Sequence, residues 1–292
     1  MELNSQIVTD PPRHAATVII LRDSPEGLQV LLMKRHQASG VLGGVHVFPG
    51  GKLDAADEHP ELLSRLSQTP QALRERLAEP ELEAARAGGL FAAAIREAFE
   101  ECRVLLGQAG PSEALTLALD TALQQGRSWN EALLQLDTRL DTACLVPWSR
   151  WITPRQPSVT HKRFDTRFFV TRVDGGQTAT HDNHEATDSV WVSPRQALLD
   201  YWDNRIELAP PQIMSLSELA RHSHSESALA HARQRPPPVI MPEAFDMDGQ
   251  RVICYPGDPR HPVAVKAWDG PSRLLFKKGR FEPFGGISEL ID

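Results

Sequence analysis

The stretch Arg96-Glu97-Ala98-Phe99-Glu100-Glu101 lies near the end of the longest amphipathic segment of the chain, residues 90–106. At about 100° per residue, the charged side chains fall on one face of a helix and the apolar side chains on the other. We therefore predict a helix over 90–106 that packs against a sheet through its apolar face. That face holds Phe91, Ala94, Ile95, Ala98, Phe99, Cys102, Leu105 and Leu106.

The polar face of this helix carries three neighbouring carboxylates, those of Glu97, Glu100 and Glu101. Their spacings of three and four residues place all three within one arc of about 100°, where like charges destabilise a helix by a few tenths of a kcal/mol each. A hard divalent cation such as Mg²⁺ or Mn²⁺ would turn this repulsion into a binding site. Arg96 would orient the carboxylates or offset their charge.

Taken alone, such a face is usually a solvated helix surface. The turn Pro49-Gly50-Gly51 changes the interpretation, because it follows an apolar strand and glycine lets the backbone approach an ion or a phosphate closely. The turn and the acidic helix together predict a metal site.

Apolar, β-branched segments on both sides of the helix predict strands. They cover residues 15–21, 28–33, 45–48, 164–173 and 189–192. Short helices punctuated by proline are expected over 58–87, with Gly88-Gly89 breaking the pattern. Further helices are expected over 112–140, from the Ser193-Pro194 cap to about Trp202, and over 212–232. The mixture indicates an α/β (α+β) protein.

The two motifs together resemble the Nudix box: Gly, five residues, Glu, seven residues, Arg-Glu, an aliphatic residue, any residue, Glu-Glu, any residue, Gly and an aliphatic residue. Gly51, Arg96-Glu97, Glu100-Glu101 and Val104 match it, and Asp57 stands where the first Glu belongs. The resemblance covers residues 15–57 and 90–106 and the strands near 164–192. It implies a Nudix-type α/β/α sandwich with a mixed sheet.

The same resemblance implies a metal-dependent hydrolase of diphosphate linkages in a nucleotide-containing substrate. It places Mg²⁺ or Mn²⁺ on Glu97, Glu100, Glu101 and the Gly50 carbonyl, and gives Glu100 and Arg96 catalytic roles. Such enzymes often recruit an acidic residue from outside the box as a metal ligand or general base. Glu185, in the segment HDNHEATD (181–188), is the candidate, with Asp188 in reserve.

The box departs from the family pattern at three places. Residues 58–95 stand where seven are usual, so about 31 additional residues split the box. Asp57 has a shorter side chain than Glu. Arg103 replaces the glycine that eases the exit from the helix, so the helix is expected to run on toward Gly107.

A split box is typical of a Nudix branch whose studied members act as acyl-coenzyme A diphosphatases. The segments 46–51, 53–57 and 163–169 resemble that branch. The general coenzyme A signature fits at Leu31, Leu32, Arg35, Gly44 and 48–51 and departs at His36, Ser39, Leu42 and His46. The resemblance to this branch implies coenzyme A or acyl-coenzyme A as the substrate, with nucleoside diphosphate sugars or dinucleotides as the alternative. An inactive nucleotide-binding Nudix module is the third possibility.

Cationic side chains near these segments are the candidate phosphate ligands. Arg35, Arg163 and Arg167 carry guanidinium groups, which pair well with phosphate oxygens. Structural ion pairs are an equal alternative for them. Trp148, Trp151 and Trp191 could stack an adenine, although core packing is the commoner role.

We expect a Nudix hydrolase domain over residues 1–235, with helical insertions at 58–89 and about 110–142. Residues 236–292 form a C-terminal extension packed on the same domain, which either covers the cleft or makes a dimer contact. The net charge of −7 gives no reason to expect nucleic acid as a partner. Three cysteines and the absence of a long apolar segment predict a cytoplasmic protein that has no membrane partner and could form a homodimer.

Overall fold

An eight-stranded mixed sheet runs through the centre of the computed structural model, which describes residues 7–36, 42–107, 113–156, 162–174 and 186–292. Its main path is β3-β2-β1-β6-β5-β8, with β4 paired to β1 and β7 to β2. The β1–β6 and β5–β8 pairs are parallel and the others antiparallel. The strands are β1 (Arg13–Ser24), β2 (Gly27–Arg35), β3 (His46–Val47), β4 (Gly50–Lys52), β5 (Val146–Ile152), β6 (Phe164–Arg172), β7 (Ala186–Val192) and β8 (Val239–Ile240).

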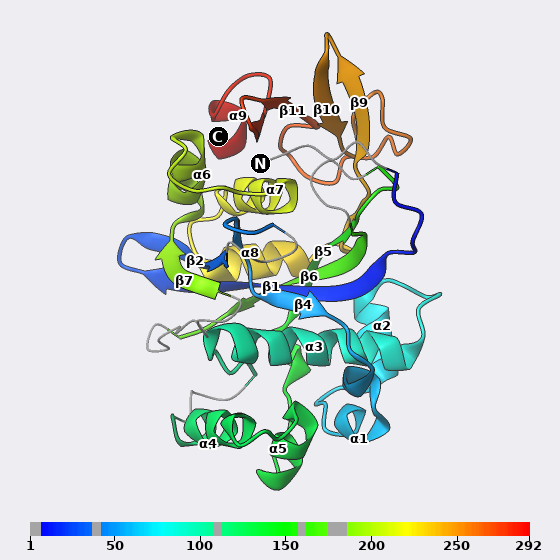
Figure 1. Cartoon of the computed structure of the whole chain (residues 1–292), viewed down its shortest axis with the longest axis vertical. Coiled ribbons are helices and arrows are strands. Elements are labelled where there is room, and N and C mark those ends of the chain that lie inside the picture. Colours follow the sequence, from blue (N-terminus) through cyan, green and yellow to red (C-terminus); the bar gives the residue numbers. More distant parts are fainter. Residues whose placement is uncertain (1–6, 37–41, 108–112, 157–161, 175–185) are drawn as a thin grey trace.

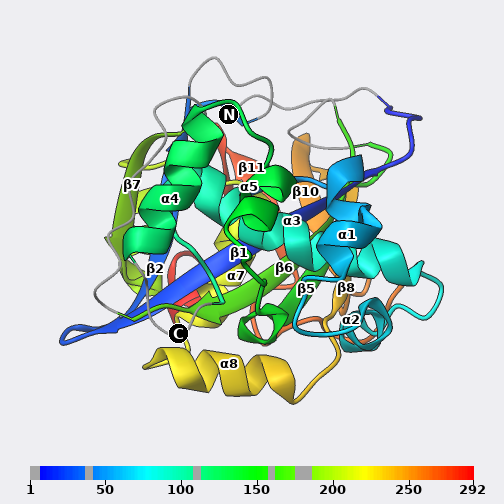
Figure 2. The same cartoon turned by 90° about the horizontal axis from the view of Figure 1, so that it is seen from below.

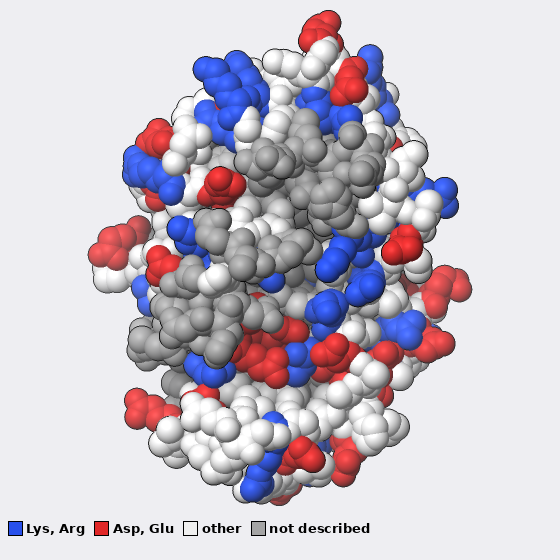
Figure 3. All heavy atoms as spheres, in the orientation of Figure 1, with Lys and Arg blue, Asp and Glu red and all other residues white. Residues whose placement is uncertain are grey.

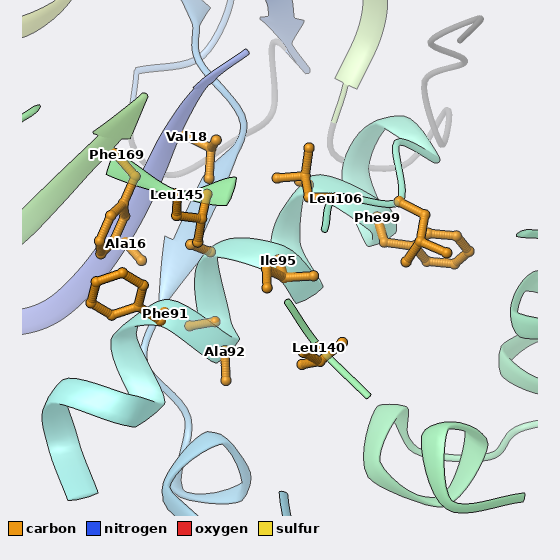
Figure 4. Close-up of a cluster of buried hydrophobic side chains, with 14 of the residues drawn as sticks. Ala16, Val18, Phe91, Ala92, Ile95, Phe99, Leu106, Leu140, Leu145 and Phe169 are labelled. Carbon is orange, nitrogen blue, oxygen red and sulfur yellow. The ribbon is translucent and has the colours of Figure 1, made fainter. Parts of the chain in front are cut away.

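Helices α1, α2, α3, α4 and α5 lie on one side of this sheet, as Figures 1 and 2 show. The central one, α3 (Ala84–Cys102), packs directly on the sheet, and Phe91 meets Phe169 of β6 at a ring-centroid distance of 4.6 Å. Figure 4 shows these rings between helix and sheet. The apolar face predicted for this helix is therefore its buried face. The other four helices are α1 (Pro60–Leu63), α2 (Pro70–Leu77), α4 (Glu113–Gln124) and α5 (Trp129–Gln135).

The opposite side of the sheet is covered by helices α6 (Pro194–Trp202), α7 (Pro210–Leu219) and α8 (Ser225–Arg233) (Figure 1). The chain after residue 236 adds β9 (Glu243–Met247), β10 (Gln250–Cys254), β11 (Arg273–Lys277), β12 (Arg280–Glu282) and α9 (Ser288–Ile291). Strands β9–β12 form a second sheet. Ile253, Leu274 and Phe281 belong to the same buried cluster as Ile19 of β1. The C-terminal segment thus shares a core with the main sheet, and the fold is an α/β/α sandwich.

The prediction that Gly88-Gly89 breaks the helix is wrong, because α3 starts at Ala84 and includes both glycines. A Cβ at Gly88 would lie 2.8 Å from Leu63 Cδ2, and one at Gly89 would lie 2.9 Å from Glu58 Cγ. These glycines permit close packing of the inserted residues on α3, which outweighs their low helix propensity.

The prediction that α3 runs on toward Gly107 is also wrong. The helix ends at Cys102, and Arg103 takes the left-handed conformation with φ 57°. Its guanidinium donates to the carbonyls of Phe99 and Glu100 and so caps the helix end. Arg103 therefore makes the exit that glycine usually makes, at a conformational cost that its contacts offset.

Two further elements differ from the sequence prediction. The single helix expected over 212–232 is two helices, α7 and α8, separated at residues 220–224. Strand β5 was not predicted, because the proline and polar residues of VPWSRWI hide its alternation and a bulge interrupts its pairing with β6. In the described part of the chain, no helix is long and apolar enough to span a bilayer.

Candidate active site

A cavity of about 650 Å³ opens between the main sheet, the start of α7 and the C-terminal segment. Side chains from β1, β4, β5 and β6 contribute to its lining, as do Glu97 and Glu100 of α3. Figure 3 shows acidic atoms gathered over α3 at mid-height, with basic atoms beside and above them. The cavity thus brings anionic and cationic groups together on one wall.

Arg96 is the hub of the acidic cluster on this wall. Its Nε and Nη2 each donate to one oxygen of Asp57 at 2.9 Å, and its Nη1 donates to Glu97 at 2.9 Å and Glu100 at 2.8 Å. Its Nη2 also reaches the Lys52 carbonyl at 3.2 Å. One guanidinium therefore fixes the positions of three carboxylates, which a point-charge lysine could not do.

Asp57 reaches Arg96 even though most of the insertion separates them in sequence. It sits in the 3-10 turn Ala55–Glu58, is 1% exposed, and accepts the backbone N–H of Asp54 at 2.9 Å. The inserted residues then fold into α1 and α2, which pack against α3. The insertion is thus looped out beside the box, and Asp57 holds Arg96 despite being shorter than Glu.

The glycine turn meets the other end of the acidic cluster. The Gly50 N–H donates to Glu101 Oε2 at 2.8 Å, and Glu101 is 4% exposed. A Cβ at Gly50 would lie 2.4 Å from the Ala16 carbonyl, and one at Gly51 would lie 2.3 Å from Glu97 Oε1. Only glycine at these two positions lets the turn approach both the strand and the carboxylates.

Burial and charge shift the protonation of this cluster in opposite senses. Burial would lower the pKa of Arg96, but the hydrogen bonds to Asp57 and the charges of Glu97 and Glu100 outweigh it and raise the pKa. Burial raises the pKa of Glu100, and Arg96 opposes that rise. Arg96 thus stays charged and limits the rise in the pKa of the Glu100 carboxyl.

The donor chemistry of the cluster suits a hard divalent cation, because it offers carboxylate oxygens and a backbone carbonyl beside a cavity. Within the described ranges, no three acidic, histidine or cysteine side chains already converge on one point. Arg96 lies among them, and Glu101 is absent from the cavity lining. The residues fit a metal by donor type rather than as a preformed cage.

The predicted site residues lie in different parts of the structure. Arg96, Glu97, Glu100, Gly50 and Arg35 all line the cavity. Glu101 is buried against Gly50. The candidate base Glu185 lies outside the described residues, and its reserve Asp188, exposed on β7, is not among the cavity-lining residues.

Arg163 and Arg167 do not line the cavity, so the expectation that they meet substrate phosphates finds no support in their positions. Arg167 is 2% exposed and pairs with both oxygens of Glu79, while Arg163 donates to the carbonyls of Thr153 and Asp10. The reason is the alternation of side chains along a strand. Phe164, Thr166 and Phe168 of β6 face the cavity, so Arg167 faces away from it.

Three cations that line the cavity were missed by the sequence analysis: Arg13, Lys52 and Lys162. Arg13 is the first residue of β1 and pairs with Phe164 of β6. Lys52 is the last residue of β4 and pairs with Ala15 of β1. The available signal was the position of Lys52 directly after the glycine turn. Trp148 and Trp151 are buried and Trp191 is partly buried, and of the three only Trp151 lines the cavity.

A glycine turn and an acidic helix brought together beneath a mixed sheet, with helices on both faces, define the chain as a Nudix-type protein. The family model described as the NUDT19 Nudix domain matches residues 12–219, and the chain belongs to that family. A crystal structure of a Nudix hydrolase from Alicyclobacillus acidocaldarius shares the fold, with a TM-score of 0.61, 24% identity, and coverage of 76% of this chain and 97% of that one.

Curated relatives are similar over most of the chain. The acyl-coenzyme A diphosphatase NUDT19 of Homo sapiens is 32% identical over 276 residues, covering 80% of this chain and 72% of the relative. The protein of that name from Gallus gallus is 29% identical, covering 86% and 80%. That from Xenopus laevis is 29% identical and covers 65% of this chain, which spans 59% of the frog protein's length.

Proposed function

We propose that this protein is a metal-dependent diphosphatase that hydrolyses the diphosphate linkage of coenzyme A or acyl-coenzyme A. The observation that carries the proposal is the Arg96 cluster: one guanidinium, held by the buried Asp57, orders Glu97 and Glu100 on the wall of a nucleotide-sized cavity. The diphosphatase activity in the names of the NUDT19 relatives supports the same substrate class.

The proposed roles follow the resemblance to the Nudix box and the positions of the described residues. Glu97, Glu100, Glu101 and the Gly50 carbonyl would hold Mg²⁺ or Mn²⁺, which when bound would polarise the diphosphate and lower the pKa of bound water. Arg96 positions the carboxylates. Arg35 and the cations Arg13, Lys52 and Lys162 would bind the phosphate oxygens. Glu185 stays the proposed general base.

The test measures cleavage of the diphosphate linkage in a panel of diphosphate compounds, with and without Mg²⁺ or Mn²⁺. Wild type is expected to cleave coenzyme A into 3′,5′-ADP and phosphopantetheine only with metal. Glu101→Gln is expected to lose at least a hundredfold in kcat, because a neutral amide is a poorer ligand. Glu113→Gln on α4 is the control with full activity. Turnover that survives metal removal or Glu101→Gln would overturn the mechanism.

The same panel of diphosphates tests two alternative functions. Preferential cleavage of a nucleoside diphosphate sugar or dinucleotide would change the substrate and keep the chemistry. Tight nucleotide binding without turnover would identify an inactive binding module, against which the intact glutamates and the ordered Arg96 cluster argue. The choice between Mg²⁺ and Mn²⁺, the cytoplasmic location, the homodimer and the domain limits 1–235 and 236–292 stay predictions.

A further inference from the structure

The elements that line the cavity differ in charge, and the lining of β5, the start of α7 and the C-terminal segment is called its uncharged part. Its charged lining residues come from β1, β2, β4, α3 and neighbouring loops. The lining residues of β5, of the start of α7 and of the C-terminal segment are all uncharged, among them Trp151, Pro211, Pro242 and Ile253. A substrate with a highly charged end and an uncharged end would match this division.

The uncharged part depends on the C-terminal segment. Pro242, Ala244 and Ile253 line the cavity but lie beyond residue 219, where the match to the family model ends. Ile253 is 3% exposed and packs in the core that joins the segment to the main sheet. This part of the wall is therefore rigidly placed.

Two side chains in the uncharged part have a buried polar atom with no hydrogen-bond partner among the described residues. Gln212, on the first turn of α7, lines the cavity and is 6% exposed, yet its Oε1 has no hydrogen-bond partner in the described part of the molecule. The indole Nε1 of Trp151, on the same cavity, is also buried without a partner among those residues. Both atoms have under 1 Å² of accessible surface, so a ligand pairs with them only after a rotation of the side chain. Buried unpaired polar atoms are costly, so a ligand that satisfies them gains affinity and specificity.

We propose that Gln212 recognises an amide group of the uncharged, amide-bearing arm of the substrate, held in the part of the cavity walled by the C-terminal segment. A secondary amide presents one donor and one acceptor, which together match a carboxamide and an indole N–H. This inference rests on the proposed function for the identity of the arm, which is the pantetheine arm of coenzyme A.

The charge division favours this arm over the nucleotide. The other half of the substrate, 3′,5′-ADP, carries phosphate groups that require cations. The lining cations Arg13, Arg35, Lys52 and Lys162 all come from outside β5, α7 and the C-terminal segment. An adenine edge could also pair with a carboxamide, so the experiment separates the two halves of the substrate.

The experiment measures binding of the two reaction products by calorimetry, on the full chain with Mg²⁺. Neither 3′,5′-ADP nor 4′-phosphopantetheine contains a diphosphate linkage, so no turnover interferes. Gln212→Met keeps the side-chain size and removes the hydrogen bonds. It is expected to weaken phosphopantetheine binding about three- to tenfold, the usual effect of one neutral hydrogen bond, and to leave 3′,5′-ADP binding unchanged.

Two further variants complete the set. Gln234→Met, an exposed glutamine after α8, is the matched control and is expected to bind both products like wild type. Ala244→Leu narrows the uncharged part of the cavity and is expected to weaken phosphopantetheine alone. Equal weakening of both products by Gln212→Met, weakening of 3′,5′-ADP alone, or no change would overturn the inference.

These outcomes are separable from failure of the proposed function. If wild type binds phosphopantetheine through Gln212 but does not cleave coenzyme A, the catalytic proposal fails and the inference stands. If wild type cleaves coenzyme A and Gln212→Met binds phosphopantetheine normally, the inference fails and the catalytic proposal stands.

Discussion

Two buried arginines, Arg96 and Arg167, each organise a cluster of carboxylates, and only one cluster lies on the cavity. Arg96 connects Asp57, Glu97 and Glu100, two of which line the cavity. Arg167 pairs with Glu79 and Asp165, and Arg150 binds the same two carboxylates. Since Glu79 follows α2, the second cluster ties the insertion to β6. Similar ion pairs are thus proposed to serve the reaction in the Arg96 cluster, and they join the insertion to the sheet in the Arg167 cluster.

The largest expected difference between the clusters is in catalysis. Arg96→Met should lower kcat by at least a hundredfold, because Glu97 and Glu100 lose their common partner and small displacements of reacting groups cost this much. Arg167→Met should leave kcat within threefold of wild type. Arg96→Met should lose about 3–5 kcal/mol in the free energy of unfolding, because the buried Asp57 carboxylate loses its cation. Arg167→Met should lose less, because Arg150 still pairs with Glu79 and Asp165.

Steady-state kinetics and urea unfolding check this pair. A large fall in kcat for Arg167→Met, with the fold retained at the assay temperature, would contradict the division between the clusters. So would full activity in Arg96→Met.

A substitution in the glycine turn should disturb the Arg96 cluster without disturbing the fold. In Gly51→Ala the new methyl group would lie 2.3 Å from Glu97 Oε1, the mobile end of a side chain. The carboxylate must move, so we expect kcat to fall about thirtyfold while the melting temperature changes little. Calorimetry and kinetics on the same sample measure both. A melting temperature that falls together with activity would show that Gly51 is required for folding instead.

The cavity lining distinguishes two arginines that the sequence placed together. Arg35→Gln should raise KM about tenfold, because a charged hydrogen bond to phosphate is lost. Arg163→Gln is the matched control, since its guanidinium binds backbone carbonyls and not the cavity. Initial rates over a range of coenzyme A concentrations provide the test, and equal rises in KM for the two variants would reject the assignment.

The smallest expected effect is on the contribution of the Arg167 cluster to the free energy of unfolding at acid pH. Burial would raise the pKa of Asp165, but the hydrogen bonds from Arg150 and the charge of Arg167 outweigh it and lower the pKa. A lowered pKa means that this carboxylate contributes stability fully above pH 3.8, its ordinary pKa, and loses it as pH falls through the folded value.

Asp165→Asn should therefore be less stable at neutral pH and should show a shallower loss of stability below pH 3.8. Urea unfolding at several pH values measures this slope. A slope equal to that of wild type would mean that the Asp165 ion pairs contribute nothing to acid stability.

The sequence predicted the elements that local patterns control. The apolar face of α3, the Ser193 cap of α6 and the strands β1 and β2 are all present. The acidic helix and the glycine turn meet as expected. These features depend on spacing within one or two elements, which a sequence displays directly.

The remaining features depend on contacts between distant segments. Whether Arg167 faces the cavity depends on the register of β6 with β1 and β5, and one step along the strand reverses the answer. Gly88-Gly89 looked like a break because the tight contact with Leu63 and Glu58 is not visible in the sequence. The cations Arg13 and Lys162 reach the cavity only through the folding of β1 against β6.

The insertion within the box has a consequence for how the protein reaches its active form. The Arg96–Asp57 and Gly50–Glu101 hydrogen bonds join residues 39 and 51 positions apart. Closing chain segments of that length costs conformational entropy, and α1 and α2, which pack on α3, lie within the segments to be closed. During refolding, helical signal should therefore return before enzymatic activity, and catalysis becomes a reporter for the last long-range closure of the chain.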